Sequence, residues 1–245
     1  MKSSFRAEAV SALVDPVLAV VFPSNCPVCA VALARPTRGP LCEGCWGGVA
    51  PKPRASCRCG QALAAAATDC GRCRRGLSPV ELGFSLGPYE GPLRAAVHEL
   101  KYHGRRRVAG RLAEAIVAQS AARGVLSDGA LLVPVPLHPR RRRERGFNQA
   151  ELLAAELARC LGLELAPAAL VRRADTPTQT GLSAARRRKN VAGAFAVRRR
   201  AQIAGRVVVL VDDVVTTGAT ARACAQALRE AGATAVRLLS AARVE

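Results

Sequence analysis

Hydrophobic positions follow two different spacings along the last two-thirds of the chain. In three stretches apolar residues recur every three or four positions, the spacing of a helix that buries one face. These stretches lie near residues 106–122, 148–161 and 218–231. Between and after them come short runs of β-branched and aliphatic residues of strand length. These runs lie at residues 130–135, 206–211 and 234–239. Strands that alternate with helices predict an α/β fold with a mainly parallel sheet and flanking helices.

The first third of the chain lacks this periodicity and is rich in Gly, Pro and Cys instead. Eight of the ten cysteines lie between residues 26 and 73. The segment 74–80 that follows has the Gly and Pro content of a linker. We therefore predict two domains, a cysteine-rich one over residues 1–79 and an α/β one over residues 80–245.

The cysteine spacing predicts zinc binding. Two CxxC pairs separated by twelve residues can place four thiolates at the corners of a tetrahedron, which is the geometry that Zn²⁺ accepts. This first site consists of Cys26, Cys29, Cys42 and Cys45. A second group combines a CxxC pair with a pair that has a single intervening residue. This second site consists of Cys57, Cys59, Cys70 and Cys73. Because sulfur fills all four positions in each site, we predict structural zinc without an open coordination position.

The sequence also predicts the compartment. The most apolar stretch near the start, residues 9–22, is shorter than the roughly 20 residues that a membrane span needs. Asp15 and Pro16 interrupt it and no small-x-small cleavage site follows, so we predict an amphipathic helix that packs on the protein, no membrane association and a cytoplasmic location. The alternative for the eight clustered cysteines, a disulfide framework, requires an oxidising compartment.

Cys160 and Cys224 stand apart on apolar helix faces and are predicted to be small core residues.

Two adjacent carboxylates end the apolar run in the segment VVVLVDDVVTTGAT, residues 207–220. The strand would deliver Asp212 and Asp213 to the carboxyl edge of the sheet, where open α/β folds bind ligands. Carboxylates at that edge can accept hydrogen bonds from ribose hydroxyls and can hold Mg²⁺ directly or through water. The alternative is an acidic helix cap, but two neighbouring charges repel unless a cation or hydroxyl groups compensate them.

The turn after the acidic pair has the chemistry of a phosphate cradle. Threonine hydroxyls are donors, a glycine lets the backbone approach closely, and the amides that begin the next helix point toward a bound anion. The candidate phosphate-binding residues are Thr216, Thr217, Gly218, Ala219 and Thr220. No Walker A pattern is present, so this is a different kind of phosphate loop.

Arginine dominates the charge of the chain. The 37 basic and 18 acidic residues give a net charge of +19. Guanidinium groups match phosphate oxygens, which favours a surface that attracts phosphates or nucleic acid, and a compositional bias toward Ala and Arg on a solvated surface is the alternative for the overall charge. One dense run leaves the strand at 130–135 directly, where a loop would meet a ligand at the sheet edge. Its members are Arg140, Arg141, Arg142, Arg143 and Arg145.

Five other polar residues carry weaker signals. Lys101 and Tyr102 follow a possible helix and are predicted to be ordinary surface, with a position beside the ligand or nucleic acid as the alternative. His98 and His103 have no evident acidic partner. His138 is predicted to cap a turn and not to act as a catalyst.

The motifs together resemble a known family. VVVLVDDVVTTGAT is similar to the ribose-phosphate signature of type I phosphoribosyltransferases. With the cysteine-rich part, VPVPLHPRRRRERGFNQA and TPTQTGLSAARRRKNVAGAF, the chain resembles the ComF family of competence-associated, amidophosphoribosyltransferase-like proteins from about Cys26 to Arg243. The resemblance implies a type I phosphoribosyltransferase-like fold with a small N-terminal zinc-ribbon-like domain. The chain departs from the family at Cys57-Arg-Cys59, where a two-residue gap is usual.

This resemblance implies a ligand, 5-phosphoribosyl 1-diphosphate (PRPP) with Mg²⁺. Asp212 and Asp213 would contact the ribose hydroxyls and the metal, the loop Thr216 to Thr220 would hold the 5-phosphate, and the arginine run would meet the diphosphate. A flexible hood would cover the reacting centre. Its candidate contacts are Gln179, Arg187 and Asn190.

Two functions follow from the resemblance. The first is transfer of the phosphoribosyl group from PRPP to a nitrogen acceptor that the sequence does not identify. The alternative is a non-catalytic protein of natural competence that senses PRPP or binds single-stranded DNA, with single-stranded DNA or competence proteins as partners. Phosphate-backbone binding fits the net charge, whereas the 3% aromatic content offers few stacking platforms for bases.

Overall fold

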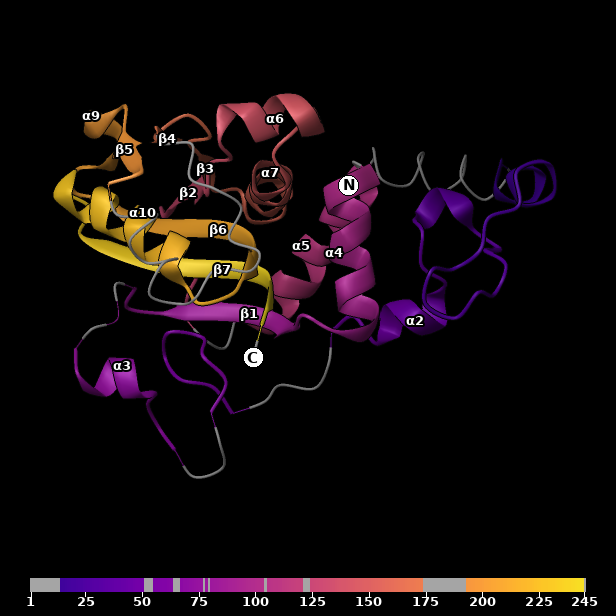
Figure 1. Cartoon of the computed structure of the whole chain (residues 1–245), viewed down its shortest axis with the longest axis horizontal. Coiled ribbons are helices and arrows are strands. Elements are labelled where there is room, and N and C mark those ends of the chain that lie inside the picture. Colours follow the sequence, from indigo (N-terminus) through magenta and orange to yellow (C-terminus); the bar gives the residue numbers. More distant parts are fainter. Residues whose placement is uncertain are drawn as a thin grey trace.

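Five parallel strands form the sheet at the centre of the molecule (Figure 1). The computed structural model describes residues 14–50, 55–63, 67–76, 78, 80–103, 105–120, 124–173 and 193–244. The strand order is β1-β7-β6-β2-β3. Their bounds are β1 Gly83–Pro88, β2 Leu131–Pro134, β3 Glu164–Leu165, β6 Val207–Val215 and β7 Ala235–Arg243. Strand β6 is therefore central, because it pairs with β2 on one side and with β7 on the other.

Helices cover both faces of this sheet. On one face lie α4 (Gly91–His103), α5 (Arg106–Ser120) and α7 (Gln149–Leu161). On the other lie α10 (Ala219–Glu230), the short α9 (Arg200–Ile203) and a two-stranded antiparallel hairpin of β4 (Leu170–Arg172) and β5 (Phe195–Val197). Successive residues of β6 point to opposite faces of the sheet and pack against the helices on those faces, as the pleat of a strand requires. Val209 and Val211 pack toward α5 and α7, whereas Val208 and Leu210 pack toward α10.

The helices and strands predicted from the hydrophobic pattern are confirmed, with one informative difference. Strand β6 does not end before the acidic pair but continues through it to Val215, where it still pairs with Arg243 of β7. Asp212 therefore pairs with Ser240 of β7, and Asp213 also lies within the strand and not in a turn. Their backbone positions are fixed more firmly than the sequence pattern indicated.

The two isolated cysteines behave differently. Cys224 is fully buried, as predicted. Cys160 is exposed, so the prediction that it is a core residue is wrong. The buried face of α7 runs through Leu153 and Leu157, and continuing it by four residues leads to Leu161, which leaves Cys160 beside the face and in solvent.

The cysteine-rich part forms two knuckles that lie on different sides of the sheet domain (Figure 1). The first contains the 3-10 helix η1 (Pro36–Arg38) and helix α2 (Glu43–Gly47), beside α4 and α5. The second contains helix α3 (Gly71–Arg74) and lies along the edge strand β1. We call them the first and second zinc knuckles.

The second zinc knuckle touches the edge strand without intervening side chains. The amide of Gly83 at the start of β1 donates to the carbonyl of Arg58 at 2.6 Å. A methyl group on Gly83 would lie 2.3 Å from the Cys59 carbonyl oxygen, and one on Gly60 would lie 2.9 Å from the carbonyl carbon of Gly83. Only glycine at both positions allows this approach.

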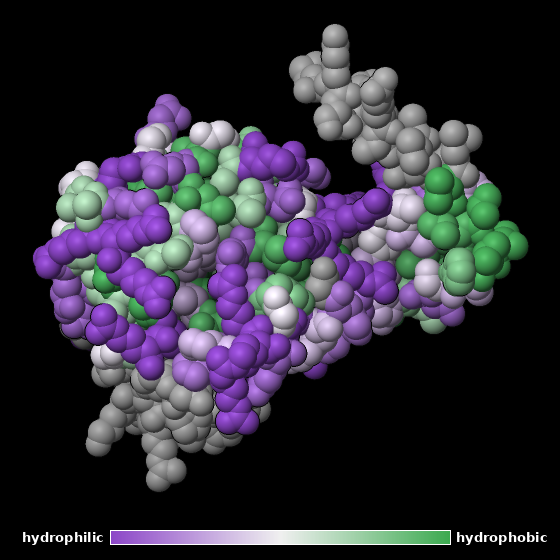
Figure 2. Space-filling view, turned by 90° about the horizontal axis from the view of Figure 1, so that it is seen from above, coloured by the Kyte–Doolittle hydropathy of each residue, from purple (hydrophilic) through white to green (hydrophobic). Residues whose placement is uncertain are grey.

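Residues 9–13 of the apolar stretch lie outside the described residues, and residues 14–22 do not pack as predicted. Residues 14–21 are helical, but Val17, Val20 and Phe22 expose 61%, 82% and 69% of their surface. The segment that contains them lies at the right of Figure 2, where the surface is hydrophobic. The buried residue of this helix is Asp15, which accepts a hydrogen bond from the Thr37 amide at 2.9 Å. Among the described helices, none combines the length and the apolar character that crossing a bilayer requires.

Candidate functional site

The acidic pair lies on the central strand near its carboxyl end. Asp212 and Asp213 are 8% and 5% exposed, and the Asp213 amide donates to Asp212 Oδ1 at 2.9 Å. Two acidic groups so close together and shielded from water cannot both carry a charge without compensation.

The surroundings shift the pKa values of the two carboxyl groups in opposite directions. Burial, and then the charge of Asp213, raise the pKa of Asp212 well above its usual range. Burial acts on Asp213 in the same direction, but the charge and hydrogen bond of Lys101 outweigh it and lower the pKa of Asp213. Asp213 is therefore the first of the pair to ionise, and Asp212 gives up its proton only at higher pH.

Lys101 is the cation that stabilises this ionised group. Its Nζ atom lies 2.8 Å from Asp213 Oδ2, its side chain is 18% exposed, and Nζ lies 5.5 Å from the centre of the Tyr89 ring. The prediction that Lys101 is ordinary surface is therefore wrong. The sequence carried a usable signal, because Lys101 lies four and eight residues after Val97 and Leu93, on the buried face of α4.

Gln149 is a second functional neighbour that the sequence analysis missed. It is 5% exposed, and its side chain helps to lower the pKa of the Asp213 carboxyl group. Asn148 fixes its position by capping α7: Oδ1 accepts from the Ala150 amide at 3.1 Å, and Nδ2 donates to the Val135 carbonyl at 3.0 Å. A polar side chain at the first position of a helix that begins at the sheet edge is the signal that could have identified it.

The phosphate cradle predicted from the sequence directly follows the acidic pair. Thr216 is exposed, and Gly218 caps α10 with a φ of 71°, a left-handed conformation that favours glycine. Thr217 Oγ1 accepts from the Ala219 amide at 3.4 Å. The loop Thr216 to Thr220 therefore joins the end of the central strand to the positive end of a 12-residue helix.

The arginine run has a different conformation from the predicted loop. Residues Pro139–Arg145 form helix α6, and His138 caps it by accepting a hydrogen bond from the Arg140 amide at Nδ1, 3.3 Å away. This confirms the prediction that His138 caps a turn. Because successive residues of a helix point in different directions, the five arginines cannot all face one ligand.

Three of these arginines do not line the cavity that adjoins the acidic pair. Arg140 pairs with Glu144 of the same helix at 3.0 Å, Arg142 pairs with Glu151 of α7 at 3.1 Å, and Arg143 is exposed. These contacts have the character of surface ion pairs, which contribute little to stability.

The other two arginines face a cavity of about 310 Å³ next to the acidic pair. Its lining residues are Lys101, Tyr102, Arg141, Glu144 and Arg145. Arg145 donates to Gln149 Oε1 at 2.7 Å, and its guanidinium lies 5.4 Å from the centre of the Tyr102 ring. Because Lys101 lines this cavity and also pairs with Asp213, the cavity and the acidic pair adjoin each other. The predicted hood residues Gln179, Arg187 and Asn190 lie outside the described residues.

A second cluster of titratable groups lies on helix α4. His103 Nδ1 and Arg105 Nε each lie 3.2 Å from Glu99 Oε2, and His98 is close enough to share a ligand position. The prediction that these histidines lack an acidic partner is therefore wrong, because the four-residue spacing places His103 over Glu99. Arg105 already compensates the carboxylate charge, so the cluster has the composition of a surface ion-pair network.

The eight clustered cysteines form two four-sulfur groups. In each group all four Sγ atoms lie within 4.8 Å of one another. Cys29 and Cys42 are 3.6 Å apart in the first group, and Cys59 and Cys70 are 3.7 Å apart in the second. A tetrahedron with Zn–S distances of about 2.3 Å requires sulfur atoms about 3.8 Å apart, so both groups fit Zn²⁺.

The single residue between Cys57 and Cys59 does not prevent the second group from forming. The Gly60 amide donates to the Cys57 carbonyl at 2.8 Å, and this turn brings both sulfur atoms to the same side. The Cys57 thiol donates to Asp69 Oδ1 at 3.1 Å, a hydrogen bond that the zinc-bound thiolate would give up.

The protein is expected to contain two zinc ions per chain. Replacing Cys29 with serine should reduce the content to one, and replacing Cys70 should do the same, because each removes one of four ligands from a separate group. Metal analysis by mass spectrometry after purification without chelator checks both numbers. A wild-type content of one zinc would contradict the second site.

Comparisons with known proteins agree with this architecture. A family model for the phosphoribosyl transferase domain matches residues 148–244, and one for the double zinc ribbon domain matches residues 17–81. The fold is therefore a phosphoribosyltransferase-type parallel sheet with flanking helices and an N-terminal double zinc ribbon, and the two four-sulfur groups are its structural zinc sites.

Similar proteins cover nearly the whole chain. The "DNA utilization protein YhgH" of Salmonella typhimurium is 36% identical over 221 residues, which are 88% of this chain and 95% of that protein. The protein of the same name from Escherichia coli is 36% identical over 82% of this chain and 92% of its own length. "Competence protein F" of Haemophilus influenzae is 32% identical over 83% of this chain and 90% of its own length.

Proposed function

This chain belongs to the ComF family, and from that premise we propose that it binds PRPP together with Mg²⁺ at the carboxyl edge of its sheet. One observation carries the proposal: Asp212 and Asp213 are buried on the central strand, and the phosphate cradle Thr216 to Thr220 follows them directly. Lys101 compensates the charge of Asp213 alone, so a bound cation or ligand hydroxyl groups would offset the remaining cost of burying Asp212. We further propose that residues 80–245 carry this site and that residues 1–79 form the zinc-binding domain, in a cytoplasmic protein.

The ligand would lie along the edge in a fixed direction. The acidic pair accepts hydrogen bonds from the 2- and 3-hydroxyls of the ribose. The 5-phosphate is held by the Thr216, Thr217 and Thr220 hydroxyls and by the amides that begin α10. The diphosphate enters the cavity lined by Lys101, Arg141 and Arg145, where cationic side chains are already gathered.

The same residues fit a magnesium ion. Carboxylate oxygens are the ligands that Mg²⁺ prefers, and Asp212 is an acid that burial keeps from ionising until a cation compensates it. When bound with PRPP, the ion would supply positive charge against the diphosphate oxygens. Asp212 and Asp213 would hold it directly or through water.

Catalysis would consist of orienting the ribose and stabilising the leaving group. The bond between C1 and the diphosphate oxygen breaks with its electron pair going to the diphosphate, and the lone pair of a nitrogen nucleophile forms the new bond to C1. The nitrogen then loses one proton. Lys101, Arg141 and Arg145 stabilise the charge on the departing diphosphate, and the Asp212 and Asp213 carboxyls orient the ring. The hood residues Gln179, Arg187 and Asn190 are proposed to close over the centre and exclude water.

Two measurements test this proposal. Calorimetric titration of the full chain with PRPP should show binding in the presence of Mg²⁺ and much weaker binding with chelator. Diphosphate release should then be measured with a panel of amines and bases. Release that depends on one acceptor supports the transferase, whereas binding without release supports the non-catalytic sensor. No binding of PRPP at any Mg²⁺ concentration would contradict both.

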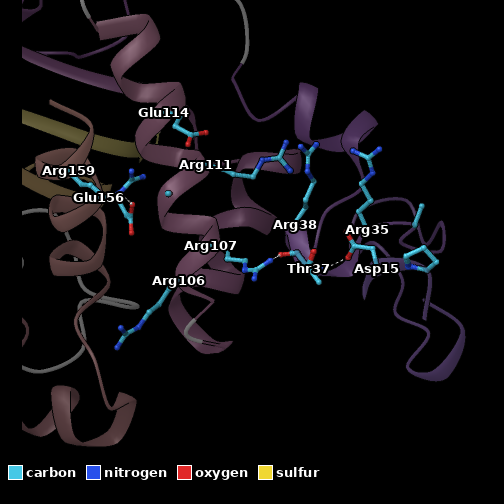
Figure 3. Close-up of a pocket in the computed structure, with 13 residues that line it drawn as sticks. Asp15, Arg35, Thr37, Arg38, Arg106, Arg107, Arg111, Glu114, Glu156 and Arg159 are labelled. Carbon is cyan, nitrogen blue, oxygen red and sulfur yellow. Dashed lines mark hydrogen bonds and ion pairs between the residues drawn. The ribbon is translucent and has the colours of Figure 1, made fainter. Parts of the chain in front are cut away.

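A second candidate function, binding of single-stranded DNA as part of natural competence, is favoured by a separate observation. An open cleft of about 980 Å³ lies between the first zinc knuckle and helices α5 and α7 (Figure 3). Six arginines and three acidic side chains line it. The arginines are Arg35, Arg38, Arg106, Arg107, Arg111 and Arg159. Such a basic groove can follow a phosphate backbone without recognising bases.

The knuckle and the helix hold the walls of this cleft together. Arg107 donates to the Thr37 carbonyl, and Arg111 Nη2 lies 2.8 Å from Glu43 Oε2 and stacks 4.2 Å from the Trp46 ring centre. Figure 3 shows Arg107 and Arg111 pointing across the cleft to the knuckle. Arg35 and Arg106 form no ion pair with any carboxylate in the described part of the chain, so their charge is available to phosphate groups.

Reversing the charge of Arg35 and Arg106 tests this second function. The double variant R35E/R106E should bind a labelled oligo-dT at least about 10-fold more weakly, with a shallower dependence of affinity on salt, because each lost phosphate contact removes about 0.7 from the slope. Fluorescence anisotropy at several salt concentrations measures both. The matched control R198E/R199E makes the same charge change at an exposed site near β5. Equal weakening by both variants would show that only net charge matters and would contradict a site in the cleft.

A further inference from the structure

We propose that Arg72 of the second zinc knuckle binds the 5-phosphate of the ligand, so that this knuckle forms one wall of the phosphate site. The inference rests on the proposed function, which assigns the 5-phosphate to the loop Thr216 to Thr220. It adds a binding residue that lies 145 residues before Thr217 in the sequence and outside every motif assigned to the ligand.

The contact between knuckle and loop is the first observation. Arg72 Nη1 donates to the Thr217 carbonyl oxygen at 3.4 Å, across 145 residues of sequence. Thr217 lies in the middle of the cradle, between Thr216 and the glycine that caps α10. A guanidinium has five N–H donors, and this contact uses one of them. The side chain is half-buried, and the other four donors are not used in this contact.

The charge of the loop is the second observation. Thr216 to Thr220 contain hydroxyl groups, a glycine and an alanine but no cationic side chain. The amides and dipole at the start of α10 carry only a partial positive charge, whereas a phosphate monoester carries nearly two negative charges at neutral pH. A cation that reaches the loop from another element would balance this charge. Arg72 supplies a planar fork that matches phosphate oxygens.

The position of the knuckle is the third observation, because a phosphate ligand must be held in place. The close contact of Gly60 with Gly83 fixes the knuckle to strand β1. On the other side Arg243, which ends β7 and is 8% exposed, donates to Gln61 Oε1 at 3.2 Å and to the Cys59 carbonyl at 3.4 Å. The knuckle is thus fastened to the sheet at two points near its own cysteines.

The zinc site completes this support. Arg72 lies between Cys70 and Cys73 in helix α3, a helix of four residues that has too few hydrogen bonds to be stable alone. Zinc binding by the two cysteines therefore sets the position of the guanidinium. Ligand affinity becomes dependent on zinc in the second site, which gives that site a role beyond folding.

Substitution of Arg72 tests the inference, with the two halves of the ligand as probes. R72A should weaken binding of PRPP and of ribose 5-phosphate by about 10-fold, the effect of about 1.4 kcal/mol from one charged hydrogen bond. Binding of magnesium diphosphate alone should be unchanged, because that group lies at the opposite end of the site. R72K should restore part of the affinity. R74A, which removes an exposed arginine from the same helix, should bind all three like wild type.

Zinc analysis and calorimetry on the full-length variants separate the outcomes. Selective loss of ribose 5-phosphate binding with two zinc ions retained supports direct contact. Unchanged binding in R72A overturns the inference, and so does equal weakening of all three ligands, because a merely structural arginine would affect them together. If the wild-type protein binds neither PRPP nor ribose 5-phosphate, the proposed function itself fails. If the wild-type protein and R72A bind both ligands equally well, only the role of Arg72 fails.

Discussion

Replacing Asp212 and Asp213 together with asparagine is expected to weaken Mg²⁺-dependent PRPP binding by at least about 100-fold, or about 2.7 kcal/mol. Both carboxylates would be lost as acceptors for the ribose hydroxyls and as oxygen ligands for Mg²⁺, while the side-chain volume stays almost the same. Calorimetric titration with PRPP at fixed Mg²⁺ measures the change. Circular dichroism of the variant shows whether the fold is retained.

The single variant D212N supplies a control against simple unfolding. Burial raises the pKa of Asp212, so the stability that its neutral form provides is fully present below the pKa of the unfolded chain and is lost as pH rises through the higher folded pKa. Asparagine is neutral at every pH. D212N without ligand should therefore be more stable than wild type at pH 8, by a few degrees in melting temperature, while its PRPP binding is lost. Unchanged affinity in D212N/D213N would show that the pair does not hold the ligand.

Replacing Lys101 with methionine is expected to destabilise the protein by about 3 kcal/mol. Lys101 Nζ lies 2.8 Å from Asp213 Oδ2, and its removal leaves a carboxylate that is 5% exposed without its cation. Removing one partner of a buried ion pair costs about 3–5 kcal/mol, and the partial exposure of Lys101 favours the lower end of that range. Urea denaturation followed by circular dichroism measures the free energy of unfolding.

A double-mutant cycle shows whether this effect comes from the pair itself. K101M/D213N removes both charges, so it should be more stable than K101M and its loss should be clearly smaller than the sum of the two single losses. K101R, which keeps the charge, should lose less than K101M. Additive losses in the cycle would mean that Lys101 stabilises the helix by its packing, as a surface lysine would, and not by pairing with Asp213.

The parts of this site that the sequence could predict are those with a local pattern. The apolar run of β6, the acidic pair and the threonine-rich turn are contiguous, so their order along the chain already places them at one edge of the sheet. The cysteine groups were predictable for the same reason, since each group is short and its spacing reflects the geometry of one metal. Even the irregular pair Cys57 and Cys59 closes its cluster within one turn.

The parts that could not be predicted are long-range contacts. Lys101 meets Asp213 across 112 residues, and only the packing of α4 on the sheet brings them together. Arg72 meets Thr217 because the second zinc knuckle lies along the edge strand β1, which no spacing within the cysteines indicates. The conformation of the arginine run was predicted wrongly, because composition does not distinguish a loop from a short helix. In helix α6, Arg140, Arg142 and Arg143 are exposed and do not line the cavity.

The exposed apolar residues near the start show a further limit. The hydrophobic pattern predicts that Val17, Val20 and Phe22 are buried. It does not identify the part of the protein against which they would pack. In the described structure they remain exposed, while Asp15 of the same helix is buried against Thr37. A polar group that finds a backbone donor can thus be buried where its apolar neighbours are not.

The most direct test of the central claim is a crystal structure of the full chain with Mg²⁺ and PRPP. We expect the ribose hydroxyls within hydrogen-bonding distance of Asp212 and Asp213, and the 5-phosphate in the loop Thr216 to Thr220. A ligand bound elsewhere on the protein, with Asp213 still paired to Lys101 and no density over the loop, would contradict it.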